Sequence, residues 1–237
     1  MTLKCVVTRI PPPAAARREP PAQAYGHAAA AAQRLHFHGV EVHGAHGYLI
    51  DQFFWDKTNL RNDEYGGNLA QRSRFATEVI REIRRRVGPS FPVVLRLSLW
   101  KLQDYTAKPV TTPQEWATVI EPLVEAGVDA FHLSQRRYWE GEFGTPLNLA
   151  AWTRKLTGKP TITVGSVTLD NSTAEMMQGQ GSSPTHNIAP LLASLARQQF
   201  DLVAVGRALI ANPDWPRRIR HGLPLNPYTL SLLQTLH

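Results

Sequence analysis

The chain has 237 residues, of which 43% are hydrophobic and 19% charged, a composition typical of a soluble globular protein rather than a disordered, collagen-like or coiled-coil one. It has no apolar run of the roughly 18 to 20 residues that a membrane span needs, and no signal-peptide pattern at its N-terminus. We therefore expect a cytoplasmic protein without membrane contact. The single cysteine, Cys5, excludes an internal disulfide and a thiolate metal site.

The formal net charge is +7, from 26 Lys and Arg against 19 Asp and Glu. Residues 1–25 hold four of the basic residues and one acidic residue, so the remainder of the chain is only mildly basic. The densest basic run, at 81–86, shares a helical pattern with Glu78 and Glu82, which predicts a solvated face with salt bridges. The charge therefore does not indicate a nucleic-acid partner.

Residues 1–25 form a basic arm rich in proline and alanine, with no amphipathic period. The segment 3–8 is apolar enough for a short strand, but no partner for it can be predicted. We therefore divide the chain into this arm and one folded unit, residues 26–237.

The folded unit alternates helix and strand patterns in chain order. A helix is predicted through the alanine run 28–32, and a strand over 40–43. Asn68 is a candidate N-cap for one long helix over 68–87, stopped by Gly88. Further strands are predicted over 92–98, 128–134, 160–165 and 202–206, and further helices over 112–126, 149–156, 188–198 and 213–221. The polar segment 170–187 predicts a flexible loop.

Five apolar strands separated by helices predict an all-parallel sheet covered by helices, which is the α/β class. A closed (β/α)₈ barrel takes about 250 residues, or roughly thirty for each unit. Since fewer than 40 residues precede the first of these strands, three more units do not fit upstream. Spacing alone leaves two architectures open, an open parallel sheet and a barrel that lacks its first three βα units.

Chemically useful side chains cluster after the strand 40–43, at the end where parallel α/β folds place their sites. His43 and His46 are three residues apart, and Tyr48 follows, so three hydrogen-bond donors can converge on one oxygen and polarise a carbonyl. Two other interpretations stay open at this point: histidines bonded to the loop backbone, and an HxxH zinc site. The zinc site lacks an evident third ligand.

The sequence motifs resemble those of a known family. GVEVHGAHGYLIDQF and TNLRNDEYGGNLAQRSRF lie within 39–75, and VVLRLS, WKLQDYT, ITVGSV and LVAVGRALIANPDW follow at 93–98, 100–106, 162–167 and 202–215. Together they resemble the Old Yellow Enzyme family of FMN-dependent ene-reductases, over about residues 26–237. The resemblance implies a (β/α)₈ TIM barrel, of which this chain has strands four to eight and lacks the first three βα units.

The resemblance also implies roles for particular residues. His43 and His46 would hold the oxygen of an enone-type substrate, and Tyr48 would donate a proton. The family uses FMN, with NAD(P)H as hydride donor, to reduce activated C=C bonds. Arg96, a charge within the buried strand pattern VVLRL, would lie beside the flavin ring, unless it forms a surface ion pair. The phosphate would be held by Gly165, Ser166, Gly206 and Arg207, although turn geometry alone could require the glycines.

The departures from the family pattern define the alternatives. No segment matches the first three strands, which carry part of the flavin site, and a barrel without them exposes two strand edges. We expect such edges to pair with another chain, either a second copy or a chain that supplies the absent strands. A catalytically inactive remnant and a module that only binds FMN or phosphate are the alternative functions. The segment 139–143 would line the substrate mouth or pack at the rim, and 61–67 would close a loop.

Overall fold

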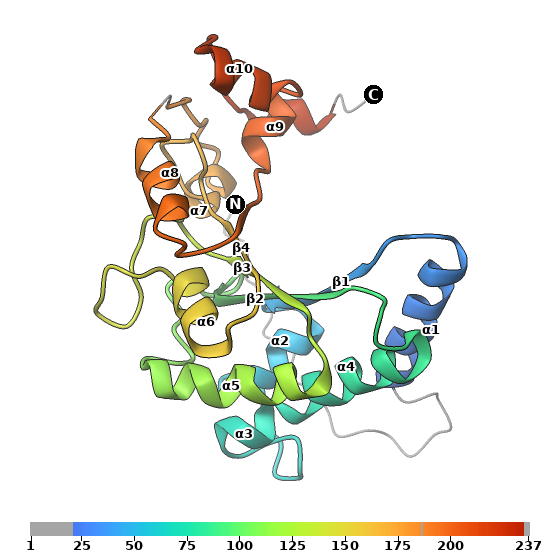
Figure 1. Cartoon of the computed structure of the whole chain (residues 1–237). Coiled ribbons are helices and arrows are strands. Elements are labelled where there is room, and N and C mark those ends of the chain that lie inside the picture. The colour runs from blue at the N-terminus through green and yellow to red at the C-terminus, as the bar shows by residue number, and fades with distance from the viewer. Residues whose placement is uncertain (1–20, 186, 235–237) are drawn as a thin grey trace.

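The protein is described by a computed structural model that covers residues 21–185 and 187–234 (Figure 1). The predicted strand at 3–8 and most of the predicted arm lie outside the described residues. Residues 21–25, which the prediction placed in the arm, instead begin α1 (Pro21–Arg34). This helix packs against α4 (Arg74–Val87). That contact explains why residues 21–25 are helical although the composition of the arm did not predict a helix.

A single five-stranded sheet organises the described part of the chain. It consists of β1 (Val40–His46), β2 (Val93–Lys101), β3 (Ala130–Ser134), β4 (Thr161–Val164) and β5 (Leu202–Val203). The strands lie in sequence order and all neighbours are parallel, so the predicted α/β class and the five strands are confirmed. Among the described residues β1 and β5 each pair with one neighbour only. That another chain covers these edges stays a prediction.

The two faces of the sheet differ in chemistry because side chains alternate along each strand. On β2, Val93, Leu95 and Leu97 are buried in the main hydrophobic core. Arg96 points to the opposite face, where the strand register places it between His43 of β1 and His132 of β3. One face therefore carries the apolar core and the other carries polar side chains.

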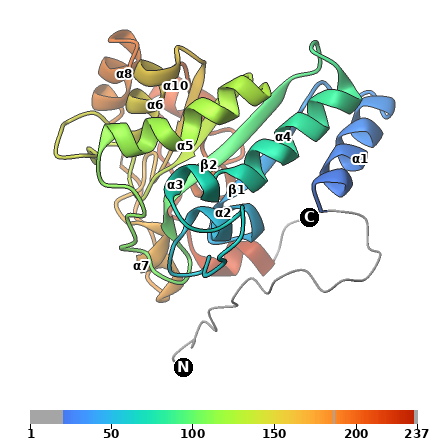
Figure 2. The same ribbon diagram turned by 90° about the horizontal axis from the view of Figure 1, so that it is seen from below.

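Helices cover the apolar face in chain order. Figure 2 shows α1, α4, α5 (Pro113–Ala126) and α6 (Leu149–Thr157) following one another along one side of the sheet. α5 begins at a capping box between Thr112 and Glu115 and ends at Gly127, whose φ of 111° is left-handed. α6 is capped by Asn148 and ends at Gly158. Both predicted glycine stops are confirmed.

The predicted helix over 68–87 is wrong in one respect, because two helices occupy it. Asn68 caps α3 (Leu69–Arg72) through a capping box with Gln71, and α4 starts afresh at Arg74. At the junction, the Ser73 hydroxyl donates to the carbonyl of Leu69 at 3.0 Å. Such back-bonding by serine competes with the regular helical ladder and bends helices, which accounts for the break.

The same set of contacts, centred on an aspartate, occurs just before β3 and just before β5. Asp129, just before β3, accepts from the N–H of Val93 at 2.8 Å, donates its own N–H to the Val93 carbonyl, and pairs with Arg84 of α4. Asp201, just before β5, does the same with Thr161 and with Arg154 of α6. Arg84 is therefore not part of the solvated face that the sequence predicted, whereas Arg85 and Arg86 do pair with Glu82 on α4.

The segment 170–187 contains regular structure, contrary to the predicted flexible loop. Within it lies α7 (Thr173–Met177), which starts at a capping box between Ser172 and Glu175. Isolated bridges join Leu169 to Pro184 and Ser182 to Tyr228. The described chain finishes with α8 (Ala189–Ala196), α9 (Arg207–Ala211), α10 (Trp215–His221) and the 3₁₀ turn η1 (Leu230–Gln234), and α8 to α10 gather at the β4 end of the sheet (Figure 1). The remaining short helix, α2 (Leu49–Phe54), follows β1 directly.

Candidate active site

A pocket of about 350 Å³ opens at the carboxyl ends of the strands. Every strand supplies a residue to it at or next to its last position, and the volume falls within the roughly 300–1,000 Å³ that small-ligand sites occupy. Of the eight predicted site residues, seven line the pocket, namely His46, Tyr48, Arg96, Gly165, Ser166, Gly206 and Arg207. The structure thus brings together residues that are up to 161 positions apart in the sequence.

The eighth residue, His43, lies beside the pocket rather than in its lining. Its ring centroid is 5.1 Å from that of His46 and 5.2 Å from that of Tyr48, so the three predicted donors form one cluster. Tyr48 follows the strand as the N-cap of α2, and about half of it is exposed. The cluster therefore has a side open to solvent.

The orientation of His46 is set by two neighbours. Its Nε2 lies 2.7 Å from Oγ of Ser134 at the end of β3, and its ring stacks on Trp100 at 4.3 Å between centroids. The bond to Ser134 leaves Nδ1 as the ring nitrogen that can meet a ligand. Burial, with the charge of Arg96 second, lowers the pKa of His46 to about 3, so its imidazole is neutral at ordinary pH. Partial burial and then Arg96 also lower the pKa of His43, against the opposing charge of Glu41.

This pKa predicts a dependence of stability on pH. The folded chain keeps His46 neutral down to about pH 3, whereas the unfolded chain protonates it near 6.5. Between these values the unfolded state binds more protons, so the contribution is fully present above about pH 6.5 and is lost as the pH falls toward 3. We expect the free energy of unfolding to drop by about 2 kcal/mol more between pH 7 and pH 5 in the unmodified chain than in His46→Gln. Urea unfolding at both pH values measures this, and equal losses would contradict it.

Arg96 is the cation at the base of the pocket. Its Nε is buried and has no hydrogen-bond partner among the described residues, and burial lowers its pKa. The negative charge of Glu41 opposes this shift, but the Glu41 carboxylate is hydrogen-bonded to His132, with 2.8 Å between Oε2 and Nδ1. Within residues 21–185 and 187–234, Arg96 therefore forms no surface ion pair and leaves one buried donor unsatisfied.

Two turns present backbone donors to the same pocket. Within the described chain, the N–H groups of Gly165, Ser166, Gly206 and Arg207 make no hydrogen bond. A side chain at Gly165 would come within 2.7 Å of the Gln135 carbonyl, so close backbone packing alone requires that glycine. Packing does not require a glycine at Gly206, because a side chain there would meet nothing within 4 Å. Gly206 lies in the lining of the pocket.

The side chain of Arg207 has a role that its motif did not predict. Its guanidinium donates to Asn171 at both Oδ1 and the carbonyl oxygen, to the carbonyl of Ser172, and to the hydroxyls of Ser166 and Ser182. These bonds tie the segment 166–182 to α9. Arg207 thus lines the pocket and also fixes the segment 166–182, part of which lines the same pocket.

Sequence reasoning assigned no site role to the other ten residues of the pocket lining, among them Trp100, Ser134 and Gln135. Trp100 belongs to β2, which continues three residues beyond its predicted end, and its indole N–H donates to the Ser134 carbonyl at 3.0 Å. In the described part of the chain, Nε2 of Gln135 is, like Nε of Arg96, a buried donor in this pocket without a partner. Position at a strand end was the available signal for Ser134 and Gln135. Of the two positions predicted for Trp139, the substrate mouth and the rim, the structure does not show the first, because Trp139 lines a separate hollow with Pro190 and Arg197.

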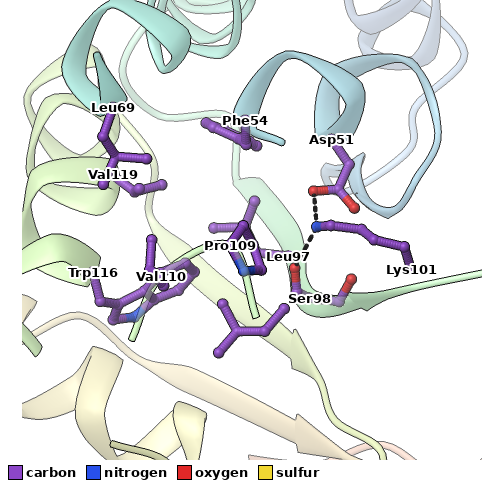
Figure 3. A pocket seen from close by; sticks show the side chains of 11 residues that line it. Asp51, Phe54, Leu69, Leu97, Ser98, Lys101, Pro109, Val110, Trp116 and Val119 are labelled. Atoms are coloured by element: carbon purple, nitrogen blue, oxygen red, sulfur yellow. Dashed lines mark hydrogen bonds and ion pairs between the residues drawn. The ribbon is translucent and has the colours of Figure 1, made fainter. Parts of the chain in front are cut away.

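A buried ion pair that the sequence did not reveal joins Asp51 of α2 to Lys101 at the end of β2 (Figure 3). Nζ of Lys101 is 2.5 Å from Oδ1 of Asp51 and 3.2 Å from the Ser98 carbonyl, and the two charged side chains are 0% and 2% exposed. The adjoining cavity measures only about 10 Å³ and is lined mostly by apolar side chains such as Trp116. Burial lowers the pKa of Lys101, and the charge of Asp51 opposes that shift. Burial raises the pKa of Asp51, and the charge of Lys101 opposes that shift.

In the described part of the chain, no three His, Cys, Asp or Glu side chains are grouped closely enough to hold a metal ion. None of the helices described is long and apolar enough to cross a membrane.

The parallel sheet and the pocket at the carboxyl ends of its strands are typical of α/β proteins of the barrel type. The sequence pattern of the NADH:flavin oxidoreductase / NADH oxidase family matches residues 20–183. The chain belongs to this family.

Individual relatives agree with this assignment. The chain is 35% identical to the NADH oxidase of Thermoanaerobacter brockii over 84% of its own length and 29% of that protein, and 35% identical to 12-oxophytodienoate reductase 2 of Arabidopsis thaliana over 88% of its own length and 50% of that protein. A solved Old Yellow Enzyme homologue from Zymomonas mobilis superposes with a TM-score of 0.68 at 26% identity, covering 89% of this chain and 54% of that one. The chain therefore spans about half or less of these relatives, and the predicted partial (β/α)₈ barrel is confirmed.

Proposed function

We propose that the chain carries the substrate-oxygen site and the phosphate site of an FMN-dependent NAD(P)H oxidoreductase, one that reduces the C=C bond of α,β-unsaturated carbonyl compounds. The observation that carries this proposal is the gathering of His46, Tyr48 and Arg96 with the two donor turns around one pocket. The relatives support it by name, since they include an NADH oxidase and a 12-oxophytodienoate reductase.

The residues present fit FMN in two ways. The unpaired Nε of Arg96 would meet the polar edge of the flavin ring, and the unpaired N–H groups of Gly165, Ser166, Gly206 and Arg207 would meet its phosphate. When bound, FMN supplies hydride from its N5, having been reduced by NAD(P)H.

The protein's own residues would handle the charge and the proton. As hydride adds to the β carbon, negative charge grows on the substrate oxygen, and the neutral imidazoles of His43 and His46 stabilise it by donating N–H bonds. The Tyr48 hydroxyl gives a proton to the α carbon, so the C=C bond gains one hydride and one proton. Because Tyr48 is about half exposed, water can return the proton to it.

Titration with FMN tests the proposal. We expect one-to-one binding, followed by quenching of flavin fluorescence, and a loss of about tenfold to 100-fold in affinity for Arg96→Met, because a hydrogen bond from a charged group contributes about 1.5–3 kcal/mol. Arg85→Met, on the exposed face of α4, is the matched control and should bind as the unmodified chain does. Equal affinity in the two variants would remove Arg96 from the flavin site.

Turnover separates the proposed activity from its alternative. Oxidation of NADPH by the FMN complex, dependent on added cyclohexenone, supports the oxidoreductase. Tight FMN binding without such turnover supports a module that only binds the cofactor.

A further inference from the structure

The turn that carries His46 has an uncommon backbone conformation. His46 has a φ of 65° and Gly47 one of 80°, and the pairing of β1 with β2 shifts register between Gly44 and His46. A left-handed φ is unfavourable for a residue with a side chain, so surrounding contacts must hold it. The bulge matters for the site because it turns the His46 ring toward Ser134 and Trp100.

All four backbone polar groups of this turn are hydrogen-bonded. The His46 N–H donates to Oγ of Ser98 at 2.9 Å, and its carbonyl accepts from the N–H of Leu102 at 3.2 Å. The Gly47 N–H donates to Oδ2 of Asp51 at 2.7 Å, and the Gly47 carbonyl accepts from Gln52 at 2.9 Å. The shortest of these four bonds is the one to the Asp51 carboxylate.

Lys101 connects this carboxylate to the strand that holds the other side of the turn. Its ammonium binds Oδ1 of Asp51 and also the carbonyl of Ser98, the residue whose hydroxyl accepts from His46 (Figure 3). Stability alone does not explain a buried ion pair here, since apolar residues of the same volume often give a protein that is equally stable. The negative charge of Asp51, by contrast, strengthens the hydrogen bond that the Gly47 N–H donates to it.

We propose that Asp51 and Lys101 are positioning residues that hold the His46–Gly47 turn, and with it the imidazole that faces the substrate oxygen. This inference rests on the proposed function for its consequence in binding, but the geometry of the turn can be measured without any cofactor. It assigns a task to an ion pair whose two residues are not themselves in the lining of that pocket.

The test uses the double variant Asp51→Asn/Lys101→Met, which keeps the shape of both side chains and leaves no unpaired buried charge. In the protein without cofactor we expect amide exchange at Gly47 to rise about tenfold, because a neutral acceptor replaces a charged one. We also expect the His46 ring protons to shift in NMR spectra as the ring moves from its stacking on Trp100. The FMN complex of the variant should bind a phenolate, as a mimic of the substrate oxygen, at least threefold more weakly.

Asp129→Asn is the matched control, since it weakens another ion pair that lies at the opposite end of the sheet. It should lower stability without moving the His46 resonances or the Gly47 exchange rate. A double variant with an unchanged turn would overturn the inference, and so would a changed turn with unchanged phenolate affinity. If the double variant does not fold, exchange in the unmodified chain decides: Gly47 should be protected about as well as Leu97 of β2, and rapid exchange at Gly47 would refute the proposal.

Failure of the proposed function would look different. In that case FMN or phenolate would not bind to the unmodified chain, while the two cofactor-free measurements would still report on the turn.

Discussion

The double variant His43→Ala/His46→Ala is expected to bind a phenolate at least about 100-fold more weakly than the unmodified FMN complex. A phenolate oxygen carries the charge that the substrate oxygen gains, and each hydrogen bond to a charged group contributes about 1.5–3 kcal/mol. Two such bonds are lost when both imidazoles are removed. Absorbance changes of the flavin on titration with phenolate measure the affinity.

FMN affinity provides the internal control, since neither histidine is among the residues proposed to hold the cofactor, and it should stay within about threefold. Tyr48→Phe is the matched variant, because it removes the proposed proton donor and keeps the ring beside His43. It should retain phenolate binding and lose turnover. Unchanged phenolate affinity in the double variant would exclude the two imidazoles from the oxyanion site.

Replacing Lys101 alone by methionine is expected to lower the free energy of unfolding by about 3–5 kcal/mol, because the single change leaves the Asp51 carboxylate buried without a partner. The cavity beside the pair, about 10 Å³, has little room for water to solvate that charge. Urea unfolding at pH 7 measures the difference.

Lys57→Met is the control, because Lys57 pairs with Asp104 at 3.1 Å while its side chain is 66% exposed. Exposed pairs contribute about 0–1 kcal/mol, so this change should have little effect. Similar losses in the two variants would show that the buried position of Lys101 does not matter. The comparison also separates the cost of an unpaired charge from the positioning role tested with the neutral double variant.

Much of the fold could be predicted from local sequence patterns. The apolar strands and the glycine stops at Gly127 and Gly158 depend on residues near one another in the chain, and the structure has them. The break at Ser73 and the helix α7 were missed, although Ser172 and Glu175 form a recognisable capping box. In α7 the polar composition of the segment masked a local signal that was present.

The site was predicted as a set of residues but not as a geometry. Spacing could place His43, His46 and Tyr48 at one strand end, and the structure brings them together. It could not show the bulge at His46 or the pairing of Asp51 with Lys101, because these depend on contacts between residues 50 or more positions apart. A charge within each of the apolar runs LIDQFF and LSLWK was the only sign of that pair.

The ion pairs Arg84–Asp129 and Arg154–Asp201 lie at the amino ends of the strands, whereas the pocket lies at their carboxyl ends. Substitutions that break these two ion pairs should therefore reduce how much folded protein a cell retains without altering the chemistry of each folded molecule. Changes around the pocket should do the reverse. A selection for altered substrates could thus draw on strand-end substitutions at the pocket, while second-site suppressors of unstable variants would be found at the opposite end of the sheet.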